Sequence, residues 1–93
     1  MLDKMKKLME MKKQADQIKR QLDGMVMEVD DVRGIKITIT GSQNFQSLEI
    51  DENLLGPQNK SRLESELLKS INAAIKKSQR QAAQSMASLM PGL

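Results

Sequence analysis

The sequence predicts an α+β fold in which a long helix, three antiparallel strands and a second long helix follow one another. Apolar residues recur at intervals of three and four near both ends of the chain, as in amphipathic helices. Between them, "GIKITIT" alternates strictly from Gly34 to Thr40, as a strand with one buried face does. Because the chain has only 93 residues, it forms a single domain, residues 1–93.

The first helix is predicted over about residues 1–24. Its apolar side chains keep the spacing of a seam along which one helix packs lengthwise against another. Gly24 is a suitable stop, or the point at which the seam gives way to extended chain. The seam consists of Leu8, Met11, Ala15, Ile18, Leu22 and Met25.

Three strands are predicted within about residues 26–50. The pattern from Val26 to Val32 is weakly strand-like, and "GSQN" after the alternating strand is a turn. The third strand places Leu48 and Ile50 on one face, whereas Phe45 has the opposite parity and either faces away or follows a bulge. The expected apolar face of the sheet is formed by Ile35, Ile37, Ile39, Leu48 and Ile50.

The second helix is predicted over about residues 59–90. It follows "DENLLGPQN", a connection rich in turn-forming residues, and Pro91 and Gly92 end it. Its seam repeats the three- and four-residue spacing through Leu68, Ile71, Ile75, Ser78, Ala82, Ser85 and Leu89.

The apolar residues are poorly suited to a rigid core within one chain. There are eight methionines and a single aromatic residue, Phe45, and a chain this short buries a small fraction of its surface. We therefore expect a homodimer that pools its core. The residues expected in the core or the dimer interface are Leu8, Met11, Ile18, Leu22, Ile35, Ile37, Ile39, Leu48, Ile50, Leu68, Ile71 and Ile75.

The composition argues against an enzyme, a metalloprotein and a membrane protein. The chain has no histidine and no cysteine, and its adjacent acids, such as Asp30 and Asp31, lie where turns commonly carry them. We expect no catalytic residue, no metal site, no cofactor and no small-molecule substrate. No apolar run approaches the roughly 20 residues of a membrane span, and the N-terminus lacks the apolar segment of a signal peptide, so a cytosolic location is expected.

Basic residues are concentrated at the two ends of the chain. Residues 1–24 carry seven basic and four acidic side chains, residues 25–56 carry two and six, and residues 57–93 carry six and two. On each predicted helix, basic residues spaced by seven lie on one side. Such stripes suit a phosphate backbone, although a merely solvated face has the same pattern. The candidate DNA-binding residues are Lys6, Lys13, Arg20, Arg62, Lys69, Lys76, Lys77 and Arg80.

Two stretches of the sequence resemble the YbaB/EbfC family of bacterial nucleoid-associated proteins. They are "RGIKITITGSQNFQSLEIDENLL", with Gly34, Gly41, Asp51 and the Leu54-Leu55 pair, and "LLKSINAAIKKSQ". The resemblance implies a homodimer whose helices project like tweezers. It also implies a protein associated with the nucleoid, which binds duplex DNA with limited sequence specificity, alters its conformation and has roles in nucleoid organisation and gene regulation.

Two other functions fit parts of the sequence. A prefoldin-like coiled-coil chaperone or adaptor without DNA binding has the same order of helix, hairpin and helix, and Met86, Leu89 and Met90 would contact its clients. A peripheral membrane helix is disfavoured because the first helix has no aromatic anchor and carries Glu10 and Asp16. No zinc site, helix-turn-helix spacing or stacking platform indicates direct base reading.

Overall fold

The computed structural model describes residues 2–89, and within them the order of elements matches the prediction. Helix α1 spans Leu2–Asp23 and helix α2 spans Lys60–Leu89, and between them lie strands β1 (Val26–Val29), β2 (Ile35–Thr40) and β3 (Phe45–Ile50). Two short 3-10 turns, η1 (Glu52–Leu54) and η2 (Pro57–Asn59), precede α2. Met1 and Met90, which the expected helices include, lie outside the described residues.

The three strands form one antiparallel sheet in the order β1-β2-β3. Ile35 is paired with Ile50 and Ile37 with Leu48, which brings the expected apolar side chains onto one face. A bulge between Thr38 and Ile39 then places Phe45 opposite Ile39, so the second of the two options for Phe45 is the one that forms.

Strand β1 is shorter than its alternation indicates. It ends at Val29, and the carbonyl oxygen of Val32 instead accepts a hydrogen bond from the Ile35 N–H at 3.1 Å, which closes a turn. Gly34 in this turn has φ of +91°, a backbone conformation that residues other than glycine rarely adopt. Two consecutive acids at 30 and 31 therefore begin the β1–β2 loop rather than continue the strand.

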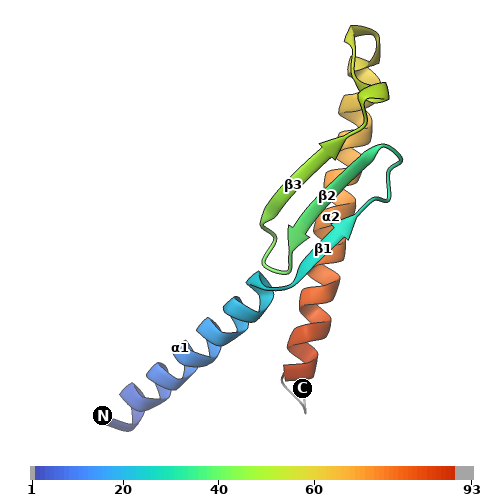
Figure 1. The fold of residues 1–93 in the computed structure, drawn as a ribbon. Coiled ribbons are helices and arrows are strands. Elements are labelled where there is room, and N and C mark those ends of the chain that lie inside the picture. The colour runs from blue at the N-terminus through green and yellow to red at the C-terminus, as the bar shows by residue number, and fades with distance from the viewer. Residues whose placement is uncertain (1, 90–93) are drawn as a thin grey trace.

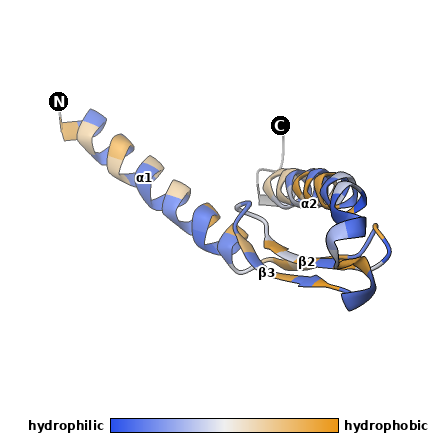
Figure 2. Ribbon diagram, turned by 90° about the horizontal axis from the view of Figure 1, so that it is seen from above, coloured by the Kyte–Doolittle hydropathy of each residue, from blue (hydrophilic) through white to orange (hydrophobic). Residues whose placement is uncertain are grey.

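Helix α2 runs along one face of the sheet, over β2 and β1, as Figures 1 and 2 show from two directions. It approaches closely because Ser70, Ala74 and Ser78, which are fully buried, present small side chains to the strands. The Ser78 hydroxyl donates a hydrogen bond of 2.7 Å to the Thr40 carbonyl oxygen. The buried apolar core consists of Val29, Ile35, Ile37, Ile39, Leu54 and Ala74.

The apolar face of β3 is left partly uncovered by α2. Phe45 and Leu48 remain 50% and 51% exposed. Beside them opens a hollow of about 370 Å³, the β3 groove, whose apolar lining residues are Ile37, Phe45, Leu48, Leu67 and Ile71. The sheet therefore has an apolar half that nothing in residues 2–89 covers.

Helix α1 projects away from the sheet and has no buried residue (Figure 1). Only its base is held: the Ser42 hydroxyl donates to the Asp23 carboxylate, and the Gln21 side-chain amide donates to the Ser85 hydroxyl at 3.3 Å. The radius of gyration is 18.5 Å, whereas a compact chain of this length has about 12 Å. The single chain is thus extended, and most of the α1 seam faces solvent.

The residues expected in the core or interface divide into three groups. Ile35, Ile37 and Ile39 are buried; Ile18, Leu22, Ile50, Ile71 and Ile75 are half-buried; and Leu8, Met11, Leu48 and Leu68 are exposed. Nothing in residues 2–89 covers the last group, which faces solvent in the single chain.

Candidate nucleic-acid interface

Four of the candidate basic residues line one open hollow on α2, next to the β1–β2 loop. They are Lys69, Lys76, Lys77 and Arg80, which we call the α2 basic face. All four are exposed, and Asn72 and Gln81 line the same hollow. Lys69 and Lys76 are two helical turns apart, about 10 Å along the axis. The face therefore presents a row of hydrogen-bond donors on a helix that is held firmly by the sheet.

Lys77 connects this face to the sheet. Its Nζ donates a hydrogen bond of 3.0 Å to the backbone oxygen of Glu28 in β1. A lysine ammonium has three donors, so two remain available to a ligand. Within residues 2–89, the side chains of Lys69, Lys76 and Arg80 form no ion pair and no hydrogen bond. These three cations therefore have no ion-pair partner among the described residues, and Lys77 links the helix that carries them to β1.

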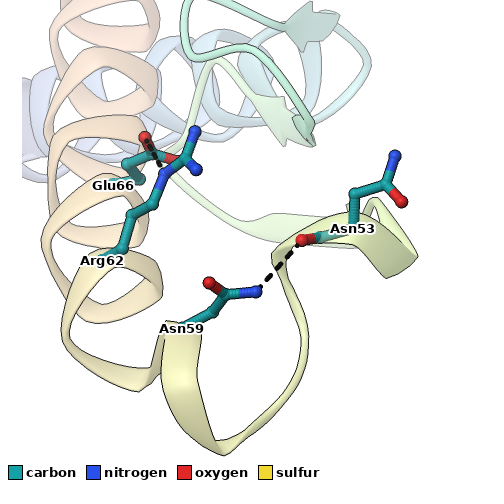
Figure 3. Close-up of polar contacts among 4 residues, drawn as sticks. All are labelled: Asn53, Asn59, Arg62 and Glu66. Atoms are coloured by element: carbon teal, nitrogen blue, oxygen red, sulfur yellow. Dashed lines mark hydrogen bonds and ion pairs between the residues drawn. The ribbon is translucent and has the colours of Figure 1, made fainter.

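Arg62 shares the seven-residue spacing but does not lie in the same hollow. Its Nε is 3.2 Å from the Glu66 carboxylate, one helical turn away, as Figure 3 shows. Arg62 and Glu66 line a different hollow together with Arg33, Gly34 and Asp51. The side chain of Arg62 is thus directed to a carboxylate of the same helix, a pairing that the i,i+4 spacing of the two residues allows.

The basic residues of α1 form a separate surface. Lys6, Lys13 and Arg20 are all exposed, on a helix that meets α2 only near its base through Gln21 and Ser85. None of them lines the hollow of the α2 basic face. The structure therefore has two basic surfaces, one on α1 and one on α2, and only the surface on α2 belongs to a helix that packs against the sheet.

Sequence reasoning did not place Asn72, Gln81 or Asp31 beside the basic residues. Helical periodicity was sufficient for Asn72, which lies three residues after Lys69 and four before Lys76. Asp31 is different, because it comes from the β1–β2 loop, and only the crossing of α2 over β1 brings it to this hollow. No local signal identifies such a contact.

Two further observations bear on the class of site. Among residues 2–89 there is no group of three or more histidine, cysteine, aspartate or glutamate side chains that would hold a metal ion. Neither helix, over its described length, has a stretch apolar enough to cross a membrane. The α2 basic face offers a ligand positive charge and amide groups, which suit a polyanion.

Comparisons with known proteins agree with this arrangement. The chain is similar to the crystal structure of the uncharacterized protein HP0035 from Helicobacter pylori, with 18% sequence identity, a TM-score of 0.68, and coverage of 89% of this chain and 98% of that chain. At this identity the likeness concerns the fold. No curated protein matches the sequence. A family model, however, matches residues 1–93 in full, and the chain belongs to the YbaB/EbfC DNA-binding family.

Proposed function

We propose that this protein binds duplex DNA as a homodimer, with limited sequence specificity, and alters the conformation of the bound DNA. Nucleoid organisation and gene regulation in the cytoplasm are the processes that such binding serves, and the proposal includes no catalytic step. The observation that carries it is the α2 basic face, where Lys77 and three cations without an ion-pair partner among the described residues line one hollow. The chain that carries this face belongs to a DNA-binding family.

Phosphate contact explains both the affinity and the weak specificity. Lysine ammonium groups are point charges without acceptors, so they pair with phosphate oxygens whatever the base sequence. Lysines at intervals of about 10 Å on a rigid helix follow a backbone whose charges are regularly spaced. Gln79, Gln81 and Gln84 on the same helix can reach base edges, but no recognition motif orients them. The shape and the charge of the DNA are therefore the main features that the protein recognises.

A second copy of the chain is the partner that the uncovered apolar surface fits. Beside the β3 groove, α2 carries a ridge that includes Leu68, 62% exposed, and the half-buried Ile75. A groove and a ridge side by side on one face support a two-fold arrangement in which the ridge of each copy enters the groove of the other. The lining of the groove contains no charged residue, so burial there leaves no unpaired charge.

The DNA-binding proposal is tested by fluorescence anisotropy on two duplexes of unrelated sequence at several salt concentrations. A triple variant of the α2 face, Lys69→Ala, Lys76→Ala and Arg80→Ala, should weaken binding to both duplexes equally. It should also reduce the slope of log affinity against log salt by about one unit for each phosphate that a substituted side chain no longer neutralises. Lys77 is left intact because it also holds β1.

The matched variant removes the same number of charges from α1, through Lys6→Ala, Lys13→Ala and Arg20→Ala. We expect a smaller reduction of the slope, because α1 has no buried residue to hold its lysines in place. Arg62→Ala, which removes a cation already paired with Glu66, should change affinity least. An unchanged slope in both triple variants would contradict the proposal.

One observation favours a second candidate, the prefoldin-like chaperone. Five large apolar residues of α1 are exposed and would contact an unfolded client: Leu2, Met5, Leu8, Met9 and Met11. Met86 on α2 is also partly exposed, whereas the side chain of Leu89 and all of Met90 lie outside the described structure. Suppression of client aggregation at stoichiometric amounts, without DNA binding, would support this candidate over the first.

A further inference from the structure

One carboxylate faces the four cations of the α2 basic face. Asp31, the second residue of the β1–β2 loop, lines the same hollow as Lys69, Lys76, Lys77 and Arg80. Its side chain is exposed, and no ion pair within 4.0 Å joins it to any of them in the described part of the chain. The carboxylate is thus available to the same space that a phosphate would enter.

The loop that carries Asp31 is held in place on both sides. Lys77 Nζ bonds the Glu28 carbonyl oxygen just before the loop, at 3.0 Å. After it, the Asp51 N–H donates to the Gly34 carbonyl oxygen at 2.8 Å, next to the turn closed by Val32 and Ile35. The Lys77 side chain thus ties the start of the loop to α2, and the Asp51 contact ties its end to the chain after β3, so the carboxylate is kept beside the basic face.

The neighbouring acid, Asp30, does not line the α2 basic face. Asp30 lines only a second hollow, with Lys36 and Glu49, whereas Asp31 lines both that hollow and the one of the α2 basic face. Two residues of the same type, adjacent in sequence, therefore differ in whether they face the cations. This difference separates a local effect of Asp31 from the effect of net charge.

We propose that Asp31 limits the affinity of the α2 basic face for the phosphate backbone, an inference that rests on the DNA binding proposed above. Its carboxylate attracts the same cations and repels a phosphate that enters the hollow from the sheet side. A bound strand consequently runs along α2 on the side away from the β1–β2 loop. Asp31 thereby acts as an internal competitor for phosphate, which keeps binding weak and reversible.

The test compares three variants by anisotropy on one duplex. Asp31→Asn removes the charge and keeps a side chain suited to a turn, and it should tighten binding about two- to fivefold at low salt, the size expected of one exposed charge pair. The gain should shrink as salt rises, because screening weakens the repulsion that is removed. Asp31→Glu keeps the charge and should bind like the wild type.

Asp30→Asn is the matched control and should leave affinity close to wild type. If Asp30→Asn and Asp31→Asn tighten binding equally, net charge explains the effect and the inference is wrong. An unchanged affinity in Asp31→Asn also overturns it. If the wild-type protein shows no measurable DNA binding, the proposed function itself is refuted. This outcome is distinct from failure of the inference about Asp31, because in that case the α2 triple variant also has no binding to weaken.

Discussion

At the scale of single residues, the contact between α2 and the sheet depends on two buried serines with different surroundings. The Ser78 hydroxyl donates to the Thr40 carbonyl oxygen at 2.7 Å. The Ser70 hydroxyl is equally buried, but among the described residues it has no hydrogen-bond partner. A buried hydroxyl without a partner costs free energy, whereas one with a partner contributes about 1 kcal/mol.

These two serines give a matched pair of alanine substitutions. Ser78→Ala should lower the free energy of unfolding by about 1 kcal/mol, because it removes a buried hydrogen bond. Ser70→Ala should leave that free energy unchanged or raise it, because it removes an unpaired polar atom. Urea denaturation followed by circular dichroism measures both, and an equal decrease in the two variants would contradict the unpaired state of the Ser70 hydroxyl.

The candidate site was predictable from the sequence only where its residues share one helix. The 3.6-residue period places Lys69, Lys76 and Arg80 on one face without knowledge of the rest of the fold. The pairing of Arg62 with Glu66 was within reach of the i,i+4 rule, but its placement near Arg33 was not. Asp31 reaches the hollow through the crossing of α2 over β1, and sequence spacing contains no information about that crossing.

At the scale of elements, the order and nearly all bounds of the helices and strands follow from periodicity, but the packing of the helices does not. The seam predicted for α2 runs through Leu68, Ile71 and Ile75, as for a helix against a helix. Of the predicted seam, Ser78 is fully buried at the sheet, but Ser70 and Ala74, which are buried beside it, lie on a neighbouring stripe outside the seam. A helix can approach a sheet closely only where its side chains are small, so the larger side chains of α2 lie beside the line of contact.

Helix α1 is the element whose stability we expect to depend most on dimer formation. Most of the stability of a helix in a protein comes from the packing of its apolar face, and α1 has no buried residue in the single chain. We expect the amide protons of residues 2–17 to gain protection from hydrogen exchange as protein concentration rises through the range of dimer formation. Protection in β2 should change much less, because its isoleucines are already buried.

Hydrogen exchange followed by mass spectrometry at several protein concentrations measures this difference. The peptide that covers β2 is the internal control for each sample. Protection of α1 that does not vary with concentration, in a protein that does dimerise, would show that the seam of α1 lies outside the interface.

At the scale of the whole molecule, the incomplete cover of the sheet is the strongest reason to expect a dimer. Three strands need one face covered, and α2 covers only the part formed by β1 and β2. The length of the chain and its single aromatic residue indicated a shared core from the sequence alone. The location of the uncovered part was not predictable, because it depends on the lateral position of α2 above the strands.

Leu48→Asp should convert the proposed dimer to a folded monomer. The side chain is 51% exposed in the single chain, so the monomer accommodates an aspartate there, but a dimer interface would bury its charge without a partner. Val26→Asp is the matched control, because Val26 is 56% exposed on the other edge strand and does not line the β3 groove. Sedimentation equilibrium measures the mass, and a dimeric Leu48→Asp variant would exclude this groove as the interface.

Because α1 is attached only at its base, a small rotation there moves the free end of the helix by a large distance. A helix of 22 residues is about 33 Å long, so a rotation of about 10° at the base moves the tip by about 6 Å. The hydrogen bonds of Asp23 with Ser42 and of Gln21 with Ser85 lie at this base and hold the angle of α1 relative to the rest of the chain. Small changes at these four side chains should therefore change the distance between the free ends of α1 and α2, without any change on the basic surfaces that the two helices carry.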